Sequence, residues 1–145
     1  MLIVAPEEPG VTGPVVFLAG PIQGALDWQA EAARLIGDRV HVANPRRPVF
    51  PADAFGEQVE WESRWLARAK AILFWLAAEH EHRCDRAYAQ TTRFELGEWI
   101  TRASARVVIG GDAAFPGLRY LKARGIPIHA TLEATVEEAV RRALG

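Results

Sequence analysis

Cysteine is almost absent from this sequence, since Cys84 is the only one among its 145 residues. A single cysteine excludes a framework of internal disulfides and any zinc site built from several cysteines. Long hydrophobic runs are missing as well, because no apolar stretch approaches the roughly 18 residues that a membrane-spanning helix needs. We therefore expect no membrane partner.

An excess of either charge is also missing. The formal net charge is −1, half of the residues are hydrophobic and 24% are charged, as in an ordinary globular domain. This balance gives no long-range attraction to nucleic acid, so no nucleic-acid partner is expected. The first residues, MLIVAPEEPG, lack the basic leader and the long apolar stretch of a signal peptide, which favours a cytoplasmic location. The length suits one domain over residues 1–145.

Three common cofactor and catalytic motifs do not occur. The glycines of GPIQG, residues 20–24, lack the GxGxxG spacing, no GK[ST] follows them, and HExxH is missing. His80 and His82 alternate with glutamates in EHEHRCD, but two imidazoles on a loop need ligands from elsewhere to bind zinc. We interpret this segment as a mobile, solvated lid and predict neither a metal nor an organic cofactor.

Apolar runs and helical periods alternate along the chain. Almost continuous apolar runs that end at glycine or proline predict buried strands. These strands are expected at residues 15–20, 39–45, 71–77, 105–111 and 126–130, with a short edge strand within 1–6. Helices are expected at residues 27–37, 55–69, 92 onward, 114–125 and 132–144, the first of them with Asp27 at its N-cap and Gly37 after its end.

This alternation is typical of an α/β fold in which helices cover both faces of a parallel sheet. Right-handed crossovers then give a flavodoxin- or Rossmann-like doubly wound sheet of about five strands. Ligands of such sheets lie outside the carboxyl ends of the strands. The loops that follow the strands are therefore the expected place of a site.

Two of these loops carry polar groups suited to a small ligand. In the first, Gly20 lets the backbone approach a ligand and Gln23 is the polar tip. In the second, NPRR, Asn44 offers a donor and an acceptor, and Arg46 or Arg47 could hold a phosphate or a carboxylate. The alternatives are an ordinary strand-to-helix turn and a solvated loop.

The helix expected at residues 55–69 places a carboxylate among apolar residues. At about 100° per residue, Phe55, Val59 and Trp65 share one arc, and Glu62 falls near its middle. A carboxylate there is costly to bury unless it is paired or hydrogen-bonded. Glu62 then lines a polar cavity or bonds a neighbour such as an arginine, and the alternative is a rotated helix that leaves it in water.

The stretch TTRFELGEW, residues 91–99, has two interpretations. Thr92 and Glu95 match a capping box, in which each side chain bonds the backbone amide of the other. The same first-turn position would keep Glu95 ionised in the helix dipole, as a nucleophile at an anomeric carbon requires. Glu98 lies one turn on and, if close, would raise one of the two pKa values.

Taken in order, VFLAGPI, NPRR, QVEWE, ILFWL and TTRFELGEW resemble the nucleoside 2-deoxyribosyltransferase-like family from about Val15 to Trp99. The resemblance implies a flavodoxin-like fold, a small-molecule nucleoside or nucleotide as partner, and homo-oligomers. It also implies cleavage of the N-glycosidic bond of a 2′-deoxynucleoside with transfer of the sugar to another base. Glu95 matches the nucleophile of the family and Thr92 its threonine, while Thr91 replaces a glycine.

Several residues are candidates for the remaining tasks of this reaction. Glu98, Glu62 and Asp85 could protonate the leaving base, and Gln23 and Asn44 would hold edges of the sugar or base. Trp75 could stack on the base, with core packing as its alternative.

Two aspartates of well-studied family members are replaced. Ala89 stands six positions before Glu95, and after the central strand the sequence offers Glu79, slightly later, instead of an aspartate. Three alternatives therefore stay open. They are transfer to water, a 5′-phosphorylated substrate held by Arg46 or Arg47, and binding of a nucleotide or nucleotide-sugar without turnover.

Overall fold

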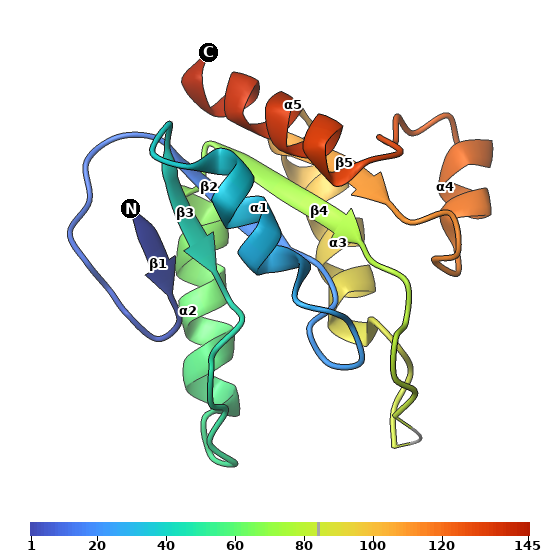
Figure 1. Ribbon diagram of the computed structural model, residues 1–145, viewed down its shortest axis with the longest axis horizontal. Coiled ribbons are helices and arrows are strands. Elements are labelled where there is room, and N and C mark those ends of the chain that lie inside the picture. The colour runs from blue at the N-terminus through green and yellow to red at the C-terminus, as the bar shows by residue number, and fades with distance from the viewer. Residues whose placement is uncertain (84) are drawn as a thin grey trace.

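The computed structural model describes residues 1–83 and 85–145, and the strands of this part form one parallel, five-stranded sheet. The register of the central strands pairs Phe17 with Ala43 on one side and with Ile72 on the other. The protein thus has the expected α/β doubly wound fold. Across the sheet the order is β1 (Leu2–Val4), β3 (His41–Asn44), β2 (Val15–Ala19), β4 (Ala71–Leu76) and β5 (Val107–Gly111) (Figure 1).

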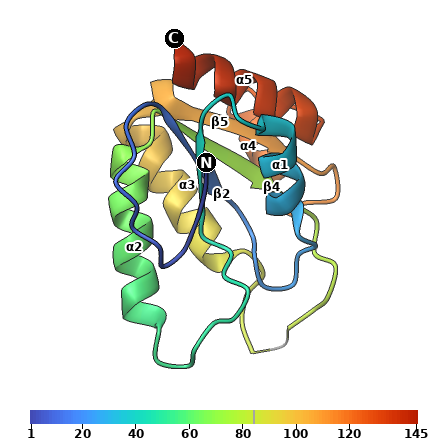
Figure 2. The ribbon, with the colours of Figure 1, turned by 60° about the vertical axis from the view of Figure 1, so that its left-hand side comes forward.

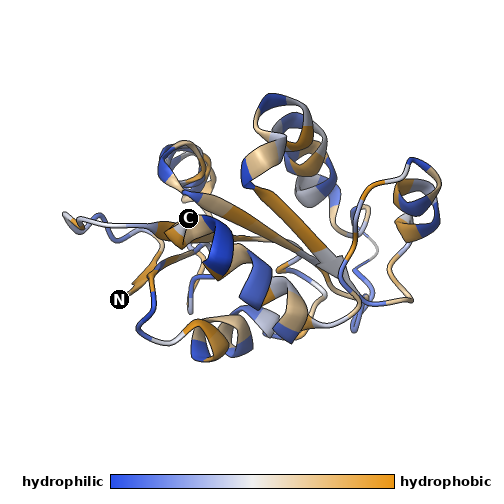
Figure 3. Cartoon of the chain, turned by 90° about the horizontal axis from the view of Figure 1, so that it is seen from above, coloured by the Kyte–Doolittle hydropathy of each residue, from blue (hydrophilic) through white to orange (hydrophobic). Residues whose placement is uncertain are grey.

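Helices cover both faces of the sheet, as the view from above shows (Figure 3). One face packs against α2 (Phe55–Arg68), α3 (Gln90–Arg102) and α4 (Leu118–Ala123). The other packs against α1 (Trp28–Ile36) and α5 (Leu132–Leu144). A short 3₁₀ turn, Ser104–Arg106, leads from α3 into β5. No helix in the described ranges is both long and apolar enough to cross a membrane.

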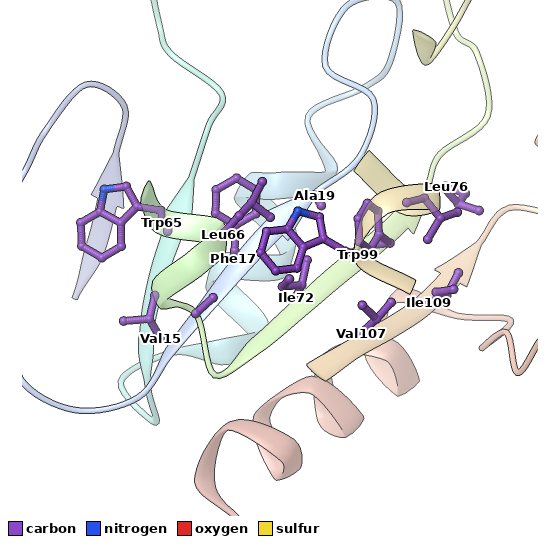
Figure 4. Packing of buried hydrophobic residues seen from close by; sticks show 14 of the residues in the cluster. Val15, Phe17, Ala19, Trp65, Leu66, Ile72, Leu76, Trp99, Val107 and Ile109 are labelled. Carbon is purple, nitrogen blue, oxygen red and sulfur yellow. The ribbon is translucent and has the colours of Figure 1, made fainter. Parts of the chain in front are cut away.

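Side chains of β4 alternate between the two cores. Ile72 and Phe74 point toward α2 and α3, whereas Leu73 and Trp75 point toward α1 and α5. Such alternation is the period of a strand that is buried on both faces. Figure 4 shows part of the first of these cores, to which the sheet contributes Phe17 and Ile72 and the covering helices contribute Trp65, Leu66 and Trp99. Each large side chain buried there contributes roughly 1.5–3 kcal/mol to stability relative to leaving it exposed.

One predicted strand is wrong. Residues 126–130 make only a single bridge, between His129 and Gly110, and the fifth strand is instead the short edge strand β1, which pairs with β3. Pro127 lacks the N–H that a continuous ladder needs, which limits this segment to one bridge. The predicted ends of α1 are confirmed, because Asp27 accepts a hydrogen bond from the Ala30 amide at 3.0 Å and Gly37 follows the helix with φ +59°.

The predicted buried arc of α2 is wrong in part. Trp61 and Trp65 are buried as a tilted aromatic pair, with 5.9 Å between their ring centroids. Phe55 and Val59 are 71% and 44% exposed. The bulky indoles take the core side of the helix and turn these two smaller side chains outward. This rotation brings Gln58 to a buried position and Glu62 to the border between the core and solvent.

Candidate active site

A cavity of about 220 Å³ lies at the carboxyl ends of the central strands. Its walls come from the loop after β2, the first half of α2, the loop after β4 and the first turns of α3. The chain runs from β2 to β3 on one side and then crosses through α2 to β4 on the other side of β2. In an open parallel sheet this switch point is where ligands bind.

Two carboxylates from different helices meet in the cavity. Glu62 of α2 and Glu95 of α3 both line it, and their side chains are hydrogen-bonded to each other. A hydrogen bond between two carboxyl groups requires a proton on one of them. Neither carboxylate has an ion pair within the described part of the chain. Two buried carboxyl groups in contact disfavour charge on both, so the pair favours a state with a proton on one of them.

The proton of the pair rests on Glu95. Burial raises the pKa of Glu95 to about 8, and the charge of Glu62, the hydrogen bond to Glu62 and the charge of Glu98 act in the same direction. Burial also raises the pKa of Glu62, but hydrogen bonds from Gln58 and Glu95 oppose this shift. Our prediction that the helix dipole keeps Glu95 ionised is thus wrong, because burial beside a second carboxylate outweighs a dipole effect of roughly 0.3–1 kcal/mol.

Gln58 holds Glu62 from the protein side. Its Nε2 donates to Glu62 Oε1 and to the Pro45 carbonyl, both at 2.8 Å. Its Oε1 is buried and has no hydrogen-bond partner among the described residues. Such an unsatisfied acceptor costs about 1–3 kcal/mol. Sequence reasoning missed Gln58, since only the position of Glu62 one turn later points to it.

The predicted capping box is absent. α3 begins at Gln90, two residues before Thr92, and its N-cap Ala89 has left-handed backbone with φ +56° and makes no side-chain cap. Glu95 is therefore in the second turn and faces Glu62 across the cavity. Thr92 is buried and lines the same cavity. Both side chains of the motif are thus turned to the cavity and not to the helix end.

Glu98 plays a lesser part in the geometry. Its side chain is exposed and pairs with Arg102 at 2.9 Å. It still adds to the rise in the pKa of Glu95, after Glu62. The carboxylate that contacts Glu95 is thus Glu62 and not Glu98.

The loop after β2 shapes one wall of the cavity. Gly20 and Gln23 both line it. A Cβ at Gly20 would lie 2.4 Å from the Trp75 carbonyl oxygen, and one at Gly24 would lie 2.7 Å from the Glu81 carbonyl oxygen. Both glycines have positive φ. Their close approaches are to the protein itself, which packs this loop against the end of β4 and the loop after it.

Asn44 and Arg46 hold the loops that surround the cavity. Asn44 is buried, and its Oδ1 accepts a hydrogen bond from the Arg46 amide at 2.9 Å. The Arg46 guanidinium donates to the carbonyls of Ala25 and Leu26 and to Gln29 Oε1, each at 3.0 Å. Neither residue is among those that line the cavity. Their contacts fix the β2–α1 loop in place.

A second hollow, of about 350 Å³, adjoins the cavity and is lined by three arginines, Arg46, Arg47 and Arg83. Each of these cations already has an acidic partner. Arg46 lies 3.8 Å from Asp27, Arg47 lies 2.7 Å from Glu57, and Arg83 lies 3.7 Å from Glu81. This pairing disfavours the alternative in which Arg46 or Arg47 is reserved for a phosphate.

Two further predicted contacts lie elsewhere. Trp75 is buried in the core beneath α1 and α5, on the face of the sheet opposite α2 and α3, so it cannot stack on a base in the cavity. Successive side chains of a strand point to opposite faces of the sheet. Phe74 and Leu76, the neighbours of Trp75 in β4, therefore point to the face that carries the cavity. Asp85 is exposed on the loop after β4 and is not among the residues that line the cavity.

The charged loop after β4 crosses toward the loop after β2. The amides of His80 and Glu81 donate to the Gly24 carbonyl at 2.7 and 3.0 Å. His82 Nδ1 lies 2.9 Å from Glu79 Oε1. Within residues 1–83 and 85–145, no group of three or more histidine, cysteine, aspartate or glutamate side chains could hold a metal ion. Cys84 lies outside the described residues.

Aromatic and apolar residues form the remaining wall. Phe50, Phe55 and Val59 line the cavity while being exposed, and Tyr88 lines it from the loop after β4. The Tyr88 hydroxyl donates to the Ala77 carbonyl at 2.7 Å. Sequence reasoning assigned Phe55 and Val59 to the core and missed Phe50 and Tyr88, since an apolar residue in a loop carries no signal of a cavity.

Comparison with protein-family models matches residues 13–113 to the family described as nucleoside 2-deoxyribosyltransferase like. Comparison with curated proteins finds no match. The matched segment spans well over half of the chain and contains Gly20, Gln58, Glu62 and Glu95. The chain therefore belongs to the nucleoside 2-deoxyribosyltransferase-like family.

Proposed function

We propose that this protein cleaves the N-glycosidic bond of a 2′-deoxynucleoside and passes the sugar to another base or to water. The observation that carries the proposal is the hydrogen-bonded pair of Glu62 and Glu95 in an open cavity at the switch point of the sheet. Two carboxyl groups at one site are what a glycosidic bond needs, one as nucleophile and one to move protons.

Glu95 is the nucleophile in this proposal. Its carboxylate attacks C1′, the base leaves, and a covalent sugar ester forms that a second base or water then opens. Because its raised pKa of about 8 favours the protonated form near neutral pH, Glu95 must lose that proton before it attacks. Glu62 is hydrogen-bonded to Glu95 and is therefore the group that takes the proton and returns it to the leaving base.

The walls of the cavity suit the two halves of a nucleoside. Phe50, Phe55 and Val59 offer an apolar surface for the flat base. Gln23 and Thr92 offer hydrogen bonds to sugar hydroxyls or to base edges. Asn44, Arg46 and Trp75 support these walls from outside the cavity.

A nucleoside-binding protein without turnover is the second candidate. The observation in its favour is the burial of Glu95 beside Glu62, which raises the pKa of Glu95 to about 8, because a neutral carboxyl group is a poor nucleophile. Ala89, which stands where well-studied relatives have an aspartate, points in the same direction.

The experiment is incubation with 2′-deoxyadenosine, 2′-deoxyguanosine, 2′-deoxycytidine and thymidine, with and without a second base, followed by chromatography of the bases. Base release without an acceptor indicates hydrolysis, and a new nucleoside indicates transfer. Base release that persists in Glu95→Ala would remove Glu95 from its role. Thermal stabilisation by a nucleoside with no base release from any of the four would favour the binding protein.

A further inference from the structure

Gln58 is oriented by its two acceptors. Its amide nitrogen points to Glu62 Oε1 and to the Pro45 carbonyl, while its amide oxygen lies buried without a partner in the described chain. Turning the amide over would place its oxygen against two other acceptors and lose both bonds. Gln58 can therefore only donate to Glu62.

This donor makes the carboxylate pair asymmetric. A hydrogen bond donated to a carboxylate favours its charged form, and Glu62 receives one from Gln58. Glu95 has no matching donor among its contacts in the described chain, and the nearby charges of Glu62 and Glu98 disfavour its ionised form. The two acids are thus prepared for different tasks before any substrate enters.

We propose that Gln58 is a positioning residue that keeps Glu62 charged, so that the shared proton rests on Glu95 before substrate binds and crosses to Glu62 when Glu95 attacks. The inference deepens the proposed function and rests on it. It assigns a role to a residue that contacts neither C1′ nor the proton, and acts through Glu62.

The proton and the bonds balance over the full cycle. In the first half, the Glu95 proton moves to Glu62, a Glu95 oxygen bonds to C1′, and the C1′–N bond breaks with its electron pair going to the base, which takes the proton from Glu62. In the second half, water bonds to C1′ and gives a proton to Glu62, while the ester bond breaks and its electron pair returns to Glu95. The proton then moves back from Glu62 to Glu95.

Other charged or titratable groups face the same cavity, and replacing Gln58 changes none of them. A titration that differs between Gln58 variants therefore reports on the amide and not on these groups. They are Glu79, Glu81, Arg83, Arg86 and Tyr88 along its lining, and Glu98 on α3.

The test is a pH titration of carboxyl ¹³C NMR signals in the full chain without substrate, with Glu62 and Glu95 assigned from Glu62→Gln and Glu95→Gln. Gln58→Met removes the donor, and Gln58→Asn shortens it so that it no longer reaches both acceptors. Thr135→Val, a change at a fully buried polar residue of α5 on the opposite face of the sheet, is the control. In the native protein and the control, we expect the titration step at higher pH to be that of Glu95, near pH 8.

In both Gln58 variants we expect the titration step at higher pH to move to still higher pH. We also expect it to appear in the carboxyl signals of both Glu62 and Glu95. Where base release is measured, kcat should fall on the order of 10- to 100-fold with KM nearly unchanged. An upper step that stays on Glu95 alone at an unchanged pH in the folded variants would overturn the inference. Failure of the proposed function is distinct, because it appears as no base release while the native titration is as described.

Discussion

Glu95 on α3 and Glu138 on α5 are glutamates on two helices that cover opposite faces of the sheet (Figures 1 and 2). Glu138 accepts hydrogen bonds from Arg141 and Arg142 at 2.7–2.8 Å, which lower its pKa to about 2. Burial and a neighbouring carboxylate raise the pKa of Glu95 to about 8. The same side chain thus titrates at opposite ends of the range because its partners differ.

The difference separates a glutamate held in surface ion pairs from one that we propose for catalysis. On α5 the lowered pKa of Glu138 favours its charged form, and ion pairs with Arg141 and Arg142 hold its side chain. In the cavity a proton is held close to neutral pH, where it can be moved during a reaction. A carboxylate whose pKa is raised and that has no cationic partner therefore indicates a candidate site better than one whose pKa an ion pair lowers.

Replacing Glu95 by glutamine should have the largest effect. Glu95→Gln removes the nucleophile but keeps the shape, so kcat for base release should fall by at least about 10³-fold. Glu138→Gln is the matched control on α5 and should leave kcat within about twofold. Steady-state rates with the best deoxynucleoside measure both, and equal losses in the two variants would erase the contrast between the regions.

Replacing Glu62 by glutamine should cost about 10²-fold in kcat with an ordinary deoxynucleoside. The native rate should fall above about pH 8, where the pair loses its shared proton, and this fall should disappear in Glu62→Gln. With 7-methyl-2′-deoxyguanosine, whose cationic base leaves without a proton, the loss should be much smaller. A loss of the same size for both substrates would show that Glu62 does not move the proton.

The pH dependence of stability should carry the signature of Glu95. Its folded pKa lies above the unfolded value of 4.5, so the native state binds the extra proton between pH 4.5 and about 8. The contribution of Glu95 to the free energy of unfolding should then be fully present below pH 4.5. It should be lost, by a few kcal/mol, as the pH rises through 8. Urea unfolding at several pH values should show that the free energy of unfolding depends less on pH in Glu95→Gln than in the native protein. The same pH dependence in both proteins would contradict the assignment.

Glu138 should show the opposite sign and the smallest effect. Its folded pKa is depressed to about 2, so its contribution is present above pH 4.5 and is lost as the pH falls toward 2. Because the pair lies at the surface, Glu138→Gln should lower the free energy of unfolding by less than about 1 kcal/mol at pH 7. Urea unfolding of the variant at pH 7 and at pH 3 checks both the size and the sign.

The sequence predicts the layers of this fold because its signals are local. Continuous apolar runs mark β2 and β4, and the Asp27 cap and Gly37 mark the ends of α1. Residues 126–130 mislead because their apolar character resembles a strand, whereas Pro127 removes a donor from the ladder. The loop positions at the carboxyl ends of the strands follow from the topology alone.

The chemistry of the site is less accessible from sequence. Glu62 and Glu95 both stand out as glutamates near apolar positions, but their contact depends on how Trp61 and Trp65 set the rotation of α2. The orientation of Gln58 depends on the Pro45 carbonyl from a different loop. Long-range packing of this kind has no local pattern, so the protonation of Glu95 was predicted with the wrong sign.

The most direct measurement is to trap the sugar on the protein. A 2′-deoxy-2′-fluoroarabinosyl nucleoside slows the opening of the ester, so a covalent intermediate accumulates and can be located by mass spectrometry of peptides. We predict one sugar per chain on the peptide that contains Glu95, and none in Glu95→Gln. Release of the base with no adduct, or an adduct on another residue, would contradict the account.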